Sequence, residues 1–328
     1  MTAARPRVQH VLLTAASFVV VVAGMKAAAP IITQILLAIF IVVLTAPLLF
    51  TLQRIGIPTG FSLLLIVLAL VLIGTVLTSV LIASLNDFSN NLPEYQASLQ
   101  EQFSGLLAYI ETKGFELPDT GLRKLLLGKN AFALLGNTIT ALTGVLSKGF
   151  LILLISIFML AEAAILPAKI RAMPGLSDQT FGRLAQIVEN LRHYFGMKAL
   201  MSLLTGALVT AFCFLNGIDY AILLGVLAFL LNFIPNIGSF IAGIPGVMLA
   251  LVQFGFGRAV FVGIGYFVIN TAVGNFLEPR VMGRGLGLSP MIIIVSLFIW
   301  SWVLGPVGML LSVPLTMIIK VALESNEE

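Results

Sequence analysis

Apolar runs long enough to cross a membrane recur along most of this 328-residue chain. A transmembrane helix needs about 20 apolar residues to cross a hydrocarbon core of about 30 Å. Three runs near the N-terminus meet or approach that length and are separated by short polar links: Val8–Met25, Ile31–Leu52 and Phe61–Leu85. We therefore predict three transmembrane helices within residues 1–85.

The first run has a second interpretation. Arg5 and Arg7 precede it and three alanines follow it, which is the layout of a secretory signal peptide. Because further apolar runs follow through the rest of the chain, an uncleaved first span is the preferred interpretation.

The pattern changes at residues 86–140, where polar side chains, Pro93 and Pro118 interrupt the apolar character. Apolar residues now recur at steps of three or four, which is typical of a helix with one apolar face: Leu92, Tyr95, Leu99, Phe103, Leu106 and Ile110. We predict a helical excursion outside the bilayer.

A fourth span is predicted at residues 141–166, followed by a basic stretch at residues 167–198. The apolar residues of that stretch again have helical spacing, which indicates an amphipathic helix lying on the membrane surface. The C-terminal region, residues 199–328, begins with a fifth span at Ala199–Leu215.

The rest of the C-terminal region contains interrupted segments. Tyr220–Leu231 and Ser239–Gln253 are apolar but would extend only about 18 and 22 Å as helices, and residues 232–238 separate them. A hairpin dipping into the membrane is the preferred interpretation, and one long broken span is the alternative. Another span follows at Ala259–Phe276, and the last apolar stretch is interrupted at residues 305–308. The pattern predicts an all-α integral membrane protein with about eight transmembrane segments, including broken or re-entrant hairpins near the C-terminus.

Composition agrees with this class. Apolar residues make up 59% of the chain and charged residues 10%, against roughly 45–50% and about 25% in soluble domains. The net charge is +4 and the basic residues are dispersed, which argues against a nucleic-acid-binding surface. The single cysteine and two histidines have no partners at ligand spacing, so we expect neither a metal site nor another cofactor.

Motifs for ATP hydrolysis and for membrane hydrolases are absent from the sequence. It has no phosphate-binding G-x-x-x-x-G-K-[ST] loop, no H-E-x-x-H and no G-x-S-x-G. We therefore expect a protein that is not an enzyme, and any transport to be driven by a gradient or to be passive.

The interruption at residues 232–238 is the strongest candidate site. A helix that ends inside a membrane exposes backbone groups that need polar partners, and such ends bind ions and polar substrates. The candidate residues here are Asn232, Pro235, Asn236 and Gly238. A kink packed against a neighbouring helix is the alternative, favoured by the small-xxx-small spacing that continues from Gly238.

A second candidate group follows the hairpin. Thr271, Asn275 and Glu278 are spaced by four and three residues, so a regular helix would place them on one face, with Arg280 just beyond. Carboxylates within membranes are usually paired, so Glu278 is expected either to pair with Arg280 or Arg284 or to be solvated at the interface. Glu278 and Glu162 are the candidate coupling carboxylates.

Several motifs of the C-terminal half together resemble a known family. They are NFIPNIG at residues 232–238, Ile244-Pro245, NFLEPRVMGRGLGLSP at residues 275–290 and GPVGMLLSVP at residues 305–314. They resemble the autoinducer-2 exporter family, also called the PerM-like permeases. The resemblance implies a bacterial inner-membrane transporter and a homo-oligomer, with a pentamer as the expected state. It also implies export of a furanosyl quorum-sensing signal, or in other members sodium–proton exchange.

The leading hypothesis is a secondary transporter that exports a small polar metabolite such as a quorum-sensing signal. A sodium–proton antiporter of the same fold and a membrane scaffold without flux remain as alternatives. Expected partners are membrane lipid, a small molecule or ion, and further copies of the chain, with no nucleic acid. The distribution of lysine and arginine favours a cytoplasmic N-terminus.

Overall fold

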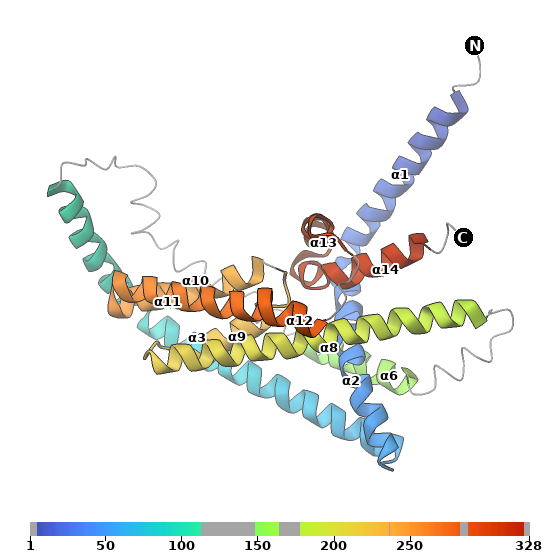
Figure 1. Ribbon diagram of the computed structural model, residues 1–328, viewed down its shortest axis with the longest axis horizontal. Helices are drawn as coiled ribbons and strands as arrows, with labels where there is room; N and C mark the ends of the chain where they lie inside the picture. Colours follow the sequence, from blue (N-terminus) through green and yellow to red (C-terminus); the bar gives the residue numbers. More distant parts are fainter. Residues whose placement is uncertain (1–4, 113–147, 164–177, 236, 283–287, 325–328) are drawn as a thin grey trace. The chain divides into compact units, whose positions relative to one another are not determined.

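The computed structural model describes residues 5–112, 148–163, 178–235, 237–282 and 288–324, and within them every regular element is a helix (Figure 1). The elements are α1 (Arg5–Ala27), α2 (Ala29–Arg54), α3 (Thr59–Thr112), α6 (Gly149–Ala163), α8 (Asp178–Leu215), α9 (Ala221–Leu231), α10 (Ile237–Phe254), α11 (Phe256–Asn270), the π-helix η1 (Thr271–Leu277), α12 (Glu278–Met282), α13 (Pro290–Leu310) and α14 (Ser312–Glu324).

Six stretches of helix are long and apolar enough to cross a membrane. They are Ala29–Arg54, Thr59–Phe88, Val188–Leu215, Ile237–Phe254, Phe256–Val281 and Pro290–Leu310. Shorter apolar stretches lie in α1, α6, α9 and α14. The prediction of an all-α integral membrane protein is confirmed, whereas the number of crossings stays a prediction.

Two helices are longer than the changes in polarity suggested. Helix α3 contains the third span and continues without a break as far as Thr112, although the chain becomes polar after Leu85. The expected surface helix of residues 167–198 and the fifth span are, from Asp178 onward, one continuous helix, α8. A change in side-chain polarity alters the preferred solvent of a helix and leaves its backbone hydrogen bonds intact, so it does not mark a helix end. Residues 113–140, both ends of the predicted fourth span and residues 167–177 lie outside the described parts.

The chain divides into two compact units. One consists of Met1–Leu63, Leu151–His193 and Gly285–Glu328, and the other of Leu64–Phe150 and Tyr194–Arg284. The second unit holds the α9–α10 segment, the end of α8 and the helices from α11 to α12, and it is the unit that contains the candidate site.

Helices α9 and α10 form a hairpin. The backbone N–H of Asp219, just before α9, donates to the Gln253 side-chain oxygen near the end of α10 at 3.3 Å. Buried residues of α9 share a core with buried residues near the end of α10, among them Leu224 and Leu249. A single broken span would separate these two ends, so the chain reverses direction between Leu231 and Ile237.

Glycines allow the hairpin to pack closely on its neighbours. A Cβ atom on Gly225 of α9 would lie 2.7 Å from the Gly206 carbonyl oxygen of α8 and would overlap the Thr210 hydroxyl. A Cβ atom on Gly246 of α10 would lie 2.6 Å from the Tyr266 hydroxyl of α11. Both crossings therefore depend on residues without side chains, and α10 and α11 run side by side in Figure 1.

The hairpin base is held by the polar part of α3. Tyr95 donates to the Asp219 carboxylate at 2.8 Å, and Asn91 donates to the Tyr220 hydroxyl at 3.1 Å. The Phe88 ring packs against both tyrosine rings. Burial, together with the contacts to Tyr220 and Asp219, raises the pKa of the Tyr95 hydroxyl, so this group stays protonated and remains a donor.

The other unit has a comparable reversal near the C-terminus. Gly305 has φ 66° inside α13, a left-handed conformation that suits glycine, and Pro306 follows it. Beyond it the chain folds back, because Trp300 Nε1 donates to the Thr316 hydroxyl of α14 at 3.1 Å. A Cβ atom on Gly308 would overlap the Trp300 carbonyl, as one on Gly238 would overlap the Leu231 carbonyl.

Gly225→Ala should lower the melting temperature of the purified protein, because the added methyl group overpacks the α8–α9 crossing at a cost of about 1–3 kcal/mol. Gly74→Ala is the matched control, since a Cβ atom there would meet nothing within 4 Å and alanine favours a helix. Thermal unfolding in detergent measures both, and equal melting temperatures for the two variants would contradict this account of the crossing.

Tyr95→Phe keeps the ring and removes its hydrogen bond to Asp219, so it should destabilise the protein by about 1 kcal/mol. Asp219→Ala removes the same bond from the other side. In a double-mutant cycle the two changes should together cost less than the sum of their separate costs. Additive changes in melting temperature would show that the bond contributes nothing to stability.

Candidate functional site

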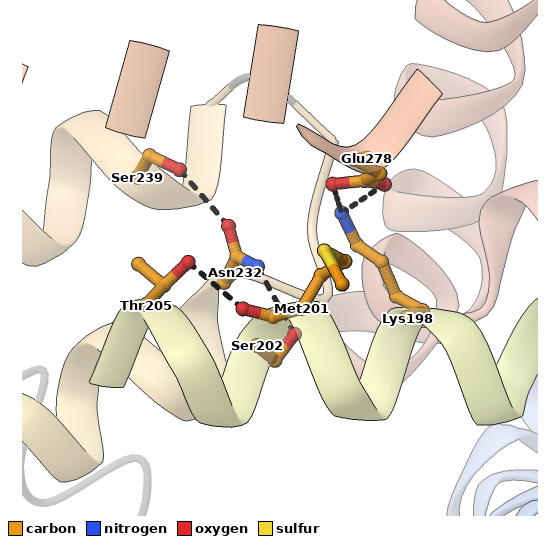
Figure 2. Close-up of polar contacts among 7 residues, drawn as sticks. All are labelled: Lys198, Met201, Ser202, Thr205, Asn232, Ser239 and Glu278. Carbon is orange, nitrogen blue, oxygen red and sulfur yellow. Dashed lines mark hydrogen bonds and ion pairs between the residues drawn. The ribbon is translucent and has the colours of Figure 1, made fainter. Parts of the chain in front are cut away.

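Polar side chains from four segments meet where the α9–α10 hairpin reverses. Figure 2 shows Lys198, Ser202 and Thr205 on α8, Asn232 in the reversal, Ser239 on α10 and Glu278 at the start of α12. Asn232 and Lys198 are each only 6% exposed although the surrounding helices are largely apolar. Buried polar groups in apolar surroundings need partners, so the arrangement of these side chains is constrained.

Asn232 is the centre of the neutral part of the cluster. Its side-chain amide donates to the Ser202 hydroxyl at 3.1 Å, and its carbonyl oxygen accepts from the Ser239 hydroxyl at 3.3 Å. A carboxamide offers two donors and two acceptor positions. These two bonds use one of each, so the same side chain retains the capacity to donate to and accept from a further polar group.

The backbone of the reversal is largely paired. The N–H groups of Asn232, Ile234 and Gly238 donate to the carbonyls of Ala228, Leu231 and Ile234. Pro235 has no N–H group, and its carbonyl accepts from the Ile237 N–H at 2.6 Å. Turn hydrogen bonds therefore pair these four N–H groups within the chain, and the Asn232 side chain adds further polar groups to the site.

Glu278 forms the charged part of the cluster with Lys198. The Lys198 ammonium lies 2.8 and 3.1 Å from the two carboxylate oxygens of Glu278. The side chains are 8% and 15% exposed, so this is a largely buried ion pair. The expected partner Arg280 is exposed instead, because residues two apart on a helix do not face each other. Arg284 lies outside the described residues.

The π-helix η1 changes the face on which the neighbouring candidates lie. Its bonds join residues five apart, as in the Glu278 N–H bond to the Val273 carbonyl, so the turn is wider than in an α-helix and residues three apart no longer stack. Asn275 is exposed and Thr271 is partly buried, while Glu278 faces α8. The sequence interpretation of one shared face assumed regular α-helical spacing and is wrong at this position.

The remaining candidates are dispersed. Pro235 is half-buried in the reversal, and Gly238 is buried against the Leu231 carbonyl. Glu162 is an exposed residue of α6 in the other unit. Asn236 lies outside the described residues. Within the described parts, no group of three or more histidine, cysteine or acidic residues is placed to hold a metal ion.

The sequence interpretation missed four members of the cluster: Lys198, Ser202, Thr205 and Ser239. It placed Lys198 at the end of a surface helix, where a lysine is unremarkable. One available signal was that Lys198 directly precedes an apolar run and has Ser202 one helical turn beyond it. A lysine in that position costs several kcal/mol in lipid unless a carboxylate pairs with it.

Glu278→Gln should destabilise the protein by about 3–5 kcal/mol, because it leaves the Lys198 charge buried without its partner. The double variant Lys198→Met/Glu278→Gln removes both charges and should recover most of the loss. Melting temperatures of both variants in one detergent measure the difference. A double variant that is less stable than Glu278→Gln would show that the pair does not act as a unit.

Comparison with known proteins identifies relatives of this chain over nearly its whole length. Residues 15–327 match the family described as AI-2E family transporter. The chain is 37% identical to the AI-2 transport protein TqsA of Escherichia coli strain K12, covering 94% of this chain and 90% of that protein. It is 35% identical to the putative transport protein YhhT of the same strain, over 97% and 91% of the two chains. A putative transport protein of Haemophilus influenzae is 36% identical over 96% and 92%.

The match covers both compact units, the α9–α10 hairpin and the residues of the buried polar cluster. The resemblance noted in the C-terminal motifs therefore extends over nearly the whole chain. This protein belongs to the AI-2E family of membrane transporters.

Proposed function

We propose that this transporter exports a small, uncharged, polar metabolite and that the cluster around Asn232 binds it during transport. The observation that supports this proposal most directly is the buried Asn232 carboxamide, held by two hydroxyl groups and still able to form further hydrogen bonds. A hydroxyl-rich molecule matches these groups, because each hydroxyl both donates and accepts.

The chemistry of the charged residues supports an uncharged substrate. The Lys198 and Glu278 charges neutralise each other at hydrogen-bonding distance. A charged substrate would have to compete with an ion pair that is already made, and one member would then be left buried without a partner. Amide and hydroxyl groups are what remain for the substrate.

The depth of the reversal supports a place on a transport path. The base of the hairpin contacts α3 just beyond the span Thr59–Phe88, and so lies near one membrane surface. Helices of 11 and 18 residues then place the reversal roughly 17–27 Å from that surface, inside a core of about 30 Å. Polar groups at that depth are expected on substrate pathways.

The relative in Escherichia coli is named for transport of AI-2, a furanosyl quorum-sensing signal, and AI-2 is the first substrate to test. Sodium–proton exchange is disfavoured because Lys198 already binds both oxygens of the Glu278 carboxylate. A scaffold without flux is disfavoured by membership of a transporter family.

We also propose a location in the bacterial inner membrane with the N-terminus in the cytoplasm. Arg183 and Arg192 in the first half of α8 would then lie on the cytoplasmic side, as the positive-inside rule requires. Large apolar side chains remain exposed on α10 and α11, including Phe240, Phe261 and Phe267. Lipid and further copies of the chain, with a pentamer as the expected assembly, would cover these surfaces.

Asn232→Ala should lower the initial rate of AI-2 uptake into inside-out membrane vesicles about tenfold. Loss of two hydrogen bonds to substrate of about 0.5–1.5 kcal/mol each corresponds to a change of this size. Asn216→Ala is the matched control, because Asn216 follows α8 directly and donates to the Phe212 carbonyl in the last turn of that helix, away from the cluster. Expression measured on the same membranes corrects for protein amount, and equal rates for both variants would remove Asn232 from the path.

A further inference from the structure

The Lys198–Glu278 pair resembles a cation site whose cation is part of the protein. The Lys198 ammonium contacts both oxygens of one carboxylate, at 2.8 and 3.1 Å. A carboxylate that binds a metal ion through both oxygens holds the ion in this position. A metal cation therefore cannot bind these two oxygens in the same way while Lys198 is in place.

The position of the pair favours a cation beside an ionised Glu278. Lys198 lies within the stretch of α8 that is apolar enough to cross a membrane, and Glu278 lies within the corresponding stretch that ends at Val281. A carboxylate in such surroundings costs several kcal/mol unless a positive charge accompanies it. The lysine supplies that charge permanently, whereas a dissolved ion would have to bind from solution.

The pair is also next to the proposed substrate site. Ser202 lies one helical turn beyond Lys198 on α8 and accepts the hydrogen bond from Asn232. The order of contacts runs from Glu278 to Lys198, along one turn of α8 to Ser202, and then to Asn232 and Ser239 (Figure 2). The cation position and the proposed substrate-binding amide are therefore both in contact with the same turn of α8.

We propose that Lys198 takes the place of a coupling metal cation at Glu278, so that this transporter requires no sodium ion at this position. Removal of the lysine side chain should convert Glu278 into a sodium-binding residue. The consequence for transport rests on the proposed function, whereas the exchange of cations can be measured by binding alone.

The first test compares melting temperatures of the purified full-length chain in sodium chloride and in choline chloride at equal ionic strength and constant neutral pH. The wild type should melt at the same temperature in both salts. Lys198→Ala should melt lower in choline and regain several degrees in sodium, with saturation, because a ligand that binds only the folded state stabilises it. Lys198→Ala/Glu278→Gln should not respond to sodium.

Lys26→Ala is the matched control, since Lys26 lies over the Trp302 ring in the other unit and has no part in this pair. This variant should show no preference for sodium. A wild type that sodium stabilises as much as Lys198→Ala would overturn the proposal. A Lys198→Ala protein whose melting temperature does not respond to sodium would also overturn it. So would a Lys198→Ala protein that cannot be purified in sodium although the double variant can.

The second test measures transport in vesicles. Wild-type AI-2 uptake should be equal with sodium and with choline, and uptake by Lys198→Ala should fall at least tenfold in choline and recover in sodium. A wild type that needs sodium for uptake would overturn the proposal. If the wild type moves no AI-2 in either salt, the proposed substrate is wrong, and the melting temperatures still decide whether Lys198 replaces a cation.

Discussion

The site depends on one constraint: a polar group buried among apolar helices must have its partner inside the protein. Lys198 and Glu278 satisfy it by pairing, and Asn232 satisfies it through Ser202 and Ser239. In water each of these contacts would be worth little, because solvent competes for the same groups. In apolar surroundings their loss leaves an unpaired group, so α8, the hairpin reversal and α12 are held in one arrangement.

Close helix packing makes those contacts possible. The hydrogen bond between Ser202 of α8 and Asn232 of the reversal requires the two backbones to approach, and Gly206 and Gly225 allow it at the crossing of α8 and α9. Gly246 has the same effect between α10 and α11. At its other end the hairpin is fixed to α3 through Tyr95 and Asp219. The hairpin is therefore anchored at its base by one set of polar contacts and carries another at its reversal.

Much of the fold could be predicted from the sequence, because apolar length and helical period are properties of a segment by itself. The all-α membrane class follows from them, and so does the interruption between two short helices at residues 232–238. The ends of α3 and α8 could not be predicted in this way, since each helix continues without a break from an apolar part into a polar part. The shared face of Thr271, Asn275 and Glu278 failed because seven residues there form a π-helix.

The sequence by itself determined that this protein lies in lipid, that its C-terminal half contains interrupted helices, and which family its motifs resemble. The tertiary structure decided which polar residues meet. Lys198 and Glu278 are 80 residues apart, and Ser202 and Asn232 are 30 apart. Local sequence patterns do not predict such pairings, because the partners are brought together only when helices distant in the chain pack against each other.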